Sequence, residues 1–169
     1  FVLICTGLVY QQLQFMRAKD LGFDRDQLLQ FGLEGSDAVG KYTVLREQLL
    51  QHPGISSVSQ SSFMPGMSQM PRRPISAEGT AGPEPQFVHF GRIDDDFFET
   101  MGIKLVAGRN YSPEFPADDT SAVIVYQAFC RNFGVEDPIG SRIRFGDSGN
   151  PNYETIVGVV EDFHQSSLH

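Results

Sequence analysis

Apolar residues along the chain gather in short runs that glycine, proline and polar residues separate. Between residues 40 and 51 they recur at three- and four-residue spacing, which predicts a helix that ends before Pro53. Shorter stretches of the same kind predict helices over residues 11–19, 97–101 and 127–133. Continuous or alternating apolar runs predict strands over residues 27–34, 86–93, 103–108, 122–125, 143–145 and 155–160. Residues 64–85, rich in Pro, Gly and Met, predict a loop or a loose hairpin.

The first ten residues, FVLICTGLVY, are almost wholly apolar and are followed by Gln11-Gln12. They are about half of the ~20 residues that a helix needs to span a bilayer, and they lack the basic start and cleavage site of a signal peptide. Two interpretations stay open: a buried terminal helix, or the outer end of a transmembrane helix.

The composition is that of a folded domain, with 40% hydrophobic and 20% charged residues among 169. The formal net charge of −8 argues against nucleic acid as a partner, and no stripe of Lys or Arg contradicts it. Cys5 and Cys130 are the only cysteines, and one of them lies in the apolar start. They make no disulfide framework, so the redox compartment stays undetermined.

The stretch GSDAVGKY, residues 35–42, differs by one residue from a nucleotide-binding P-loop, G-x-x-x-x-G-K-[ST]. Tyr42 stands where the small magnesium-binding hydroxyl should be, and Asp37 would put a negative charge where phosphate binds. A second apolar run, Ile156 to Val160, ends at Glu161-Asp162 and imitates a magnesium-binding strand. We therefore expect no nucleotide site, and we expect Ser36 or Asp37 to cap the helix that follows.

Three consecutive aspartates, Asp94 to Asp96, could hold a metal or act as acid and base. Asp94 is also a good N-cap, and the helix dipole favours anions such as Asp95 and Asp96 in a first turn. Gly102 would provide the left-handed stop of this short helix. Consecutive side chains on a helix point in different directions, so we expect the cluster to be structural and not a metal site.

Other potential ligands are scattered along the chain. Met64, Met67 and Met70 could hold Cu(I), but methionines in a loop also form adaptable contact surfaces, which is the interpretation we favour. The histidines could contribute to a metal-dependent hydrolase with Asp94 to Asp96, yet no G-x-S-x-G or H-E-x-x-H framework supports one. We expect packing or hydrogen-bonding roles for the four histidines, which are His52, His89, His164 and His169.

Four stretches resemble the periplasmic core domain of MacB/FtsX-type ABC transporter permeases, and they occur in the order found in that family. They are residues 20–24 (DLGFD), 94–109 (DDDFFETMGIKLVAGR), 137–140 (DPIG) and 156–164 (IVGVVEDFH). The resemblance runs over nearly the whole chain. No single stretch is diagnostic, but the collinear set is specific.

The resemblance implies an α+β fold with two lobes and an N-terminal helical stalk. Residues 1–23 would be the end of the first transmembrane helix and the stalk. Residues 24–110 would form a porter-like βαβ lobe that contains the Met- and Pro-rich loop 64–85. Residues 111–169 would form a smaller α+β lobe, truncated at its C-terminal end because family members continue with another strand–helix–strand.

The resemblance also implies a non-catalytic role without a cofactor or a metal. The domain would lie on the periplasmic side of the bacterial inner membrane and couple ATP hydrolysis in the cytoplasm to export or signalling. Its partners would be a separate nucleotide-binding ATPase, a second permease copy or partner permease, and a periplasmic adaptor or cargo. The competing hypothesis is a secreted or periplasmic metal-dependent hydrolase that uses Asp94 to Asp96 and nearby histidines.

Overall fold

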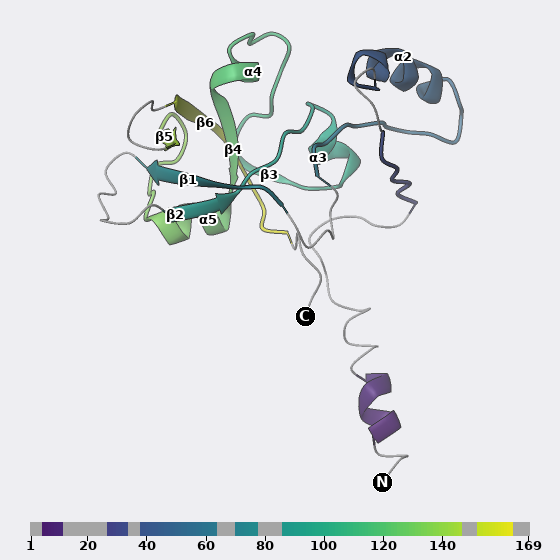
Figure 1. Cartoon of the computed structure of the whole chain (residues 1–169), viewed down its shortest axis with the longest axis horizontal. Helices are drawn as coiled ribbons and strands as arrows, with labels where there is room; N and C mark the ends of the chain where they lie inside the picture. Colours follow the sequence, from purple (N-terminus) through teal and green to yellow (C-terminus); the bar gives the residue numbers. More distant parts are fainter. Residues whose placement is uncertain are drawn as a thin grey trace.

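The computed structural model describes residues 5–11, 27–33, 38–63, 70–77, 86–146 and 152–163. Its helices are α2 (Ala38–Leu50), α3 (Phe97–Thr100), α4 (Asp118–Ser121) and α5 (Gln127–Phe133). Its strands are β1 (Arg72–Ala77), β2 (Gln86–His89), β3 (Leu105–Gly108), β4 (Ala122–Tyr126), β5 (Arg142–Phe145) and β6 (Asn152–Val160). In Figure 1, α5 lies beside β1 and β2, whereas α2 lies at the other end of the molecule, beyond α3.

The six strands form one sheet in the order β2-β1-β5-β6-β3, with β4 added alongside β6. All pairs are antiparallel except β4 with β6, which run parallel. The long strand β6 is the centre of the sheet, because β5, β3 and β4 all pair with it. The chain is thus a mixed α+β domain. The division into two lobes at residue 110 stays a prediction, and strands from both sides of that position share this sheet.

Two hydrophobic clusters pack on opposite sides of the sheet. Successive residues of a strand point to opposite faces, and accordingly Val159 belongs to one cluster and Val160 to the other. The first cluster gathers around α3, and its buried members are Phe63, Phe97, Phe98, Met101, Ile103, Val160 and Phe163. The second lies between the sheet and α5, and its buried members are Ile75, Val123, Val125, Ile143, Phe145, Ile156 and Val159.

Most of the predicted elements are confirmed. The helix over residues 127–133 is α5, and Gly134 ends it with φ of 64°, a left-handed conformation that glycine adopts without strain. The helix over residues 40–51 is α2. Within residues 64–85, predicted to be a loop or a loose hairpin, residues 72–77 form the strand β1, which pairs with β2 from the strand predicted over residues 86–93. The predicted helix over residues 11–19 lies outside the described residues, apart from Gln11.

The strand predicted over residues 27–34 is wrong, because residues 27–33 form neither helix nor strand. A strand needs a neighbour that accepts and donates its backbone hydrogen bonds, and no described strand pairs with this segment. Leu28 packs against the hydrophobic cluster around α3, but Leu29 is 85% exposed and Phe31 is 54% exposed. The apolar pattern was sound, but the pairing that would make it a strand is not formed among the described residues.

Residues 5–11 are helical, and all of their side chains are exposed. Leu8, Val9 and Tyr10 are each more than half exposed, so the described part of the apolar start is not the buried helix that one interpretation expected. Within the described residues, no helix has both the length and the apolar content that crossing a membrane requires.

Candidate functional site

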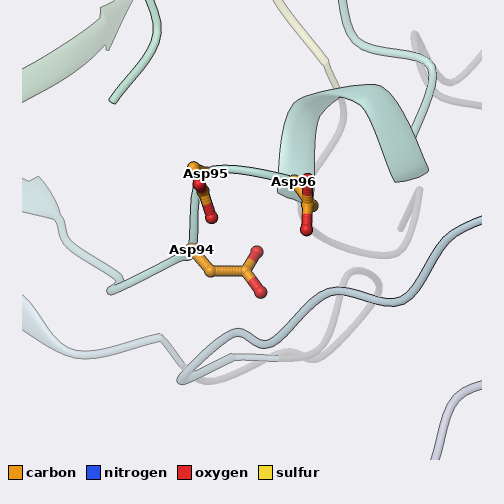
Figure 2. Close-up of side chains that lie close together, drawn as sticks. All are labelled: Asp94, Asp95 and Asp96. Atoms are coloured by element: carbon orange, nitrogen blue, oxygen red, sulfur yellow. The ribbon is translucent and has the colours of Figure 1, made fainter. Parts of the chain in front are cut away.

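The three aspartates lie together at the turn that leads into α3, as Figure 2 shows. One carboxylate oxygen from each of Asp94, Asp95 and Asp96 lies within 4.8 Å of the others. Asp94 and Asp96 are half-buried and Asp95 is exposed. The turn brings the carboxylates close because it precedes the helix, so the three side chains do not yet follow helical spacing.

The carboxylate of Asp94 reaches away from α3 to another segment of the chain. Its Oδ2 accepts a hydrogen bond from the Tyr42 hydroxyl at 2.6 Å and one from the backbone N–H of Gln60 at 2.8 Å. The prediction that Asp94 is the N-cap is therefore wrong. Asp96 occupies that position, and it makes no side-chain capping hydrogen bond. Asp94 is drawn away because the hydroxyl of α2 and the amide at residue 60 offer it two donors at once.

Asp96 forms an ion pair with Arg46, one helical turn after Tyr42 in α2. The two side chains are about one third exposed, at 36% for Arg46 and 31% for Asp96. Asp95 contributes its backbone carbonyl, which accepts a hydrogen bond from the side-chain amide of Asn110 at 2.6 Å. The cluster thus joins α2 to the start of α3 through two polar contacts, Tyr42 with Asp94 and Arg46 with Asp96. We name these two contacts the latch.

The electrostatics of the latch follow from burial and from the crowding of carboxylates. Burial raises the pKa of Asp94, and the charges of Asp96 and Asp95 add to the rise, against the hydrogen bonds from Tyr42 and Gln60, which lower it. Burial and the hydrogen bond to Asp94 raise the pKa of Tyr42 well above its ordinary value. At neutral pH, Tyr42 therefore stays protonated, and its hydroxyl donates a hydrogen bond to the Asp94 carboxylate.

A metal-dependent hydrolase finds little support in this geometry. The group of possible metal ligands that the described residues bring together consists of the three aspartates and contains no histidine. Two of the carboxylates already accept hydrogen bonds, and the guanidinium of Arg46 brings positive charge where a cation would bind. His52 accepts a hydrogen bond from the Gly54 amide and His89 lies exposed on β2. His164 and His169 lie outside the described residues.

The P-loop-like stretch lies partly outside the described residues, which include none of Gly35, Ser36 and Asp37. Tyr42 is engaged in the latch, and the helix α2 already includes Gly40 and Lys41. At the other end of the imitated motif, the Asp162 carboxylate accepts a hydrogen bond from the Ala128 backbone N–H at 2.6 Å and pairs with Arg131. Although partial burial raises the pKa of Asp162, these two partners together hold it below its usual value. Asp162 therefore caps α5.

The pair Gly108-Arg109 has a structural role. Gly108 has φ of +76°, and a Cβ atom there would lie 2.2 Å from the backbone oxygen of Val157, so no other residue fits without a shift. Arg109 forms two hydrogen bonds with the buried Asp118, at 2.5 and 2.9 Å, and its guanidinium lies 4.0 Å from the centre of the Phe115 ring. The pair closes the loop between β3 and α4.

A shallow depression of about 400 Å³ opens beside this loop. It is lined by Gly108, Arg109, Ile139, Gly140, Thr155, Ile156 and Val157. Its one ionisable side chain is that of Arg109, which Asp118 already holds. Among its lining residues, the depression therefore has no acidic side chain or histidine that could act as a general base.

Two candidate ligands from the sequence remain. Met70 is half-buried and packs against the hydrophobic cluster around α3, as expected for an apolar contact residue. Met64 and Met67 lie outside the described residues. Cys130 is half-buried on α5, where burial raises the pKa of its thiol.

The latch residues of α2 were missed from the sequence. Tyr42 and Arg46 are four residues apart, which places them on the same face of a helix. Asp94 and Asp96 are two carboxylates separated by a single residue. These intervals could have indicated a pair of contacts, but nothing local says that the two pairs meet across about fifty residues of chain.

A family model described as the MacB-like periplasmic core domain matches residues 2–169. Among solved structures, a domain assigned to a permease of Porphyromonas gingivalis is 21% identical, with a TM-score of 0.53 over 75% of this chain. The periplasmic region of MacB from Actinobacillus actinomycetemcomitans is 18% identical, with a TM-score of 0.51 over 80% of this chain. The chain spans 52% and 59% of the lengths of those two structures. No curated protein matches the chain.

Proposed function

The chain belongs to the MacB-like periplasmic core domain family of ABC transporter permeases, and we propose that it couples ATP hydrolysis in the cytoplasm to movement outside the membrane. The observation that carries this proposal is the family match, which extends from residue 2 to residue 169. The two solved structures support the α+β fold and are too distant to carry a role by themselves. In this role the domain transmits motion and performs no reaction of its own.

The proposal includes a location and partners. The domain would lie on the periplasmic side of the bacterial inner membrane, and residues 1–23 would be the end of the first transmembrane helix and the stalk. A nucleotide-binding ATPase would supply the energy, and a second permease copy, an adaptor or cargo would receive the movement. The net charge of −8 favours such partners over nucleic acid.

The latch is the feature of this fold that is best suited to movement. No described side chain of α2 is buried, and Val44 and Leu50 are exposed on its surface. Tyr42 and Arg46 join it to the rest of the domain through polar contacts. A helix held by a few polar contacts shifts at lower cost than one packed into a core, because no cavity is opened. We therefore propose that α2 moves relative to α3 during the transport cycle.

Distance measurements between spin labels in the whole permease test this role. The protein is purified with its nucleotide-binding ATPase in lipid nanodiscs, Cys5 and Cys130 are replaced by Ser, and labels are attached at Glu47→Cys in α2 and Lys104→Cys beside α3. Both positions are exposed. We expect the distance distribution to change when a non-hydrolysable ATP analogue is bound.

A second pair provides the control. Labels at Lys104→Cys and Glu136→Cys both lie on the part of the domain that contains the sheet, and their distance should stay the same in every nucleotide state. If the distance from Glu47→Cys to Lys104→Cys is also the same in the nucleotide-free, ATP-analogue and ADP states, α2 does not move with the cycle and the coupling role of this domain fails.

A further inference from the structure

One face of the sheet carries exposed aromatic side chains at the end where β1, β2 and β5 lie. Ile75 on β1 and Ile143 on β5 point to the side that α5 covers. The register of the strands places Phe87 opposite Pro74, and Tyr153 opposite Arg144, on the other side. Phe87 is 55% exposed and Tyr153 is 42% exposed, so this side is open to solvent. We call it the open face.

Two arginines lie over the aromatic rings of the open face. The guanidinium of Arg72 lies 5.8 Å from the centre of the Phe87 ring, and that of Arg142 lies 4.5 Å from the centre of the Tyr153 ring. Among the described residues, neither arginine has a carboxylate within ion-pair distance. The ring quadrupole attracts each guanidinium, and this attraction leaves the N–H donors of the guanidinium available for other partners.

Among the described residues, the charged side chains on the open face are arginines, on a protein whose net charge is −8. Arg144 lies on this face in addition to Arg72 and Arg142, by the same strand register. None of the described residues that β1, β2, β5 and β6 place on this face is acidic, since Glu154 pairs with Ile143 on the covered side. A positive surface on an acidic protein is complementary to an anionic partner, and it would repel the same face of a second copy of this chain.

We propose that the open face binds an acidic, extended segment of a partner polypeptide, whose carboxylates pair with Arg72 and Arg142. Arginine binds carboxylate through two parallel N–H bonds, and an arginine whose guanidinium already lies over a ring loses less side-chain freedom when it forms them. The rings of Phe87 and Tyr153 supply the apolar contact between the two pairs. This inference concerns which surface binds a partner, and it does not depend on whether the domain couples to ATP hydrolysis.

The sheet determines the spacing of the two pairs. Phe87 is on β2 and Tyr153 is on β6, and the strand order places β1 and β5 between them. Three steps of about 4.8 Å across the strands, together with the offset of two residues along them that the register gives, separate the rings by roughly 16 Å. An extended segment advances about 3.1 Å per residue in the polyproline II conformation, so two carboxylates about five residues apart match the two arginines.

The test uses a peptide of defined length as the probe. In the peptide Pro-Glu-Pro-Pro-Pro-Pro-Glu-Pro the glutamates are roughly 15 Å apart in a polyproline II helix. It is titrated at low ionic strength into the isotope-labelled chain, and binding is followed by the NMR shifts of the Phe87 and Tyr153 rings. Two control peptides carry the same glutamates side by side, or glutamine in their place. We expect the spaced peptide to bind more tightly than both.

Single substitutions then locate the contact. Arg72→Gln and Arg142→Gln should each weaken binding on the order of 5-fold, the loss of one exposed ion pair. Lys104→Gln removes the same charge from an exposed position elsewhere and should leave the affinity within about 2-fold. Heteronuclear spectra of each variant confirm that the fold is kept, because both arginines are exposed.

Three results would overturn the inference. Equal weakening by Lys104→Gln would mean that only net charge matters, and equal binding of the glutamine peptide would mean that the carboxylates do not contribute. The third is a lipid surface: if vesicles of phosphatidylglycerol bind in an Arg72- and Arg142-dependent manner and the peptide does not, the open face recognises membranes. Vesicles of phosphatidylcholine serve as the uncharged control.

Discussion

Replacing Tyr42 by phenylalanine removes one hydroxyl and tests the latch directly. The Tyr42 hydroxyl donates to Oδ2 of Asp94 at 2.6 Å, and Asp94 keeps only the Gln60 amide when it is gone. The other carboxylate oxygen of Asp94, Oδ1, is buried and has no hydrogen-bond partner among the described residues. The substitution therefore leaves a half-buried carboxylate with one donor where it had two.

The expected loss can be sized from the type of bond. A hydrogen bond to a charged group contributes about 1.5–3 kcal/mol, and the partial exposure of both residues reduces this to about 1–2 kcal/mol. For a domain of this length, that corresponds to a decrease in melting temperature of roughly 2–8 °C. If α2 detaches before the sheet unfolds, the same loss appears as about 10-fold faster hydrogen exchange in α2 alone.

The effect should depend on pH with a definite sign. Burial raises the pKa of Asp94 in the folded state, so the folded protein binds more protons than the unfolded one and the contribution of Asp94 to stability falls as pH rises through the raised pKa. The hydrogen bond from Tyr42 opposes that rise, and without it the pKa of Asp94 moves further up. The destabilisation by Tyr42→Phe should therefore be greater at about pH 7.5 than at about pH 4.

Urea unfolding and amide exchange at the two pH values measure these quantities. Tyr153→Phe is the matched control, since it removes a hydroxyl that makes no hydrogen bond among the described residues and should cost less than about 0.5 kcal/mol. The reasoning is refuted if Tyr42→Phe costs no more than Tyr153→Phe, or if its cost is the same at both pH values.

Three further predictions concern other parts of the chain. Gly108→Ala should destabilise the protein by about 3 kcal/mol or more, because φ is +76° and the new Cβ would clash with the Val157 oxygen. Gly134→Ala is the control: its φ is +64° but the space around it is open, so it should cost only about 1 kcal/mol. Thermal unfolding compares the two variants. Asp118→Asn should cost about 1–2 kcal/mol of unfolding free energy near neutral pH. Because Arg109 holds the pKa of Asp118 below its usual value, that cost should disappear as pH falls below the ordinary carboxyl pKa. The exposed Asp119→Asn is the control, and an equal loss from both variants would contradict the role of the ion pair. Deleting residues 1–10 should leave the melting temperature of the sheet unchanged and reduce self-association in sedimentation experiments, since the helix at 5–11 is exposed and contributes nothing to the two hydrophobic clusters; loss of the fold on deletion would count against this.

The parts of this protein that the sequence determined are those with local causes. The helix over residues 127–133 and its stop at Gly134 follow from apolar spacing and from the freedom of glycine at positive φ, both of which act within one or two turns. The long apolar run that becomes β6 is likewise apparent from composition alone, because only a buried strand accommodates it. The family resemblance was also readable, because its stretches keep their order along the chain.

The candidate site depended on contacts between distant segments. Asp94 looked like a helix cap because its neighbours in sequence suggested one, yet its carboxylate has a better set of donors in Tyr42, which is 52 positions away. Local capping and long-range hydrogen bonding compete for the same oxygen, and only the packed structure shows which wins. The latch could not have been derived from the aspartates alone.

Strand pairing was decided by the tertiary structure as well. Residues 27–33 have the apolar content of a strand and form none, whereas β1, expected only as a loose hairpin, joins both β2 and β5. A strand is stable only when another strand completes its backbone hydrogen bonds, and the identity of that neighbour is not encoded in the strand's own residues. The same pairing sets the register of the strands. Side-chain direction alternates along every strand, so the register decides which residues of neighbouring strands point to the same face, and here it brings together Arg72, Phe87, Arg142 and Tyr153.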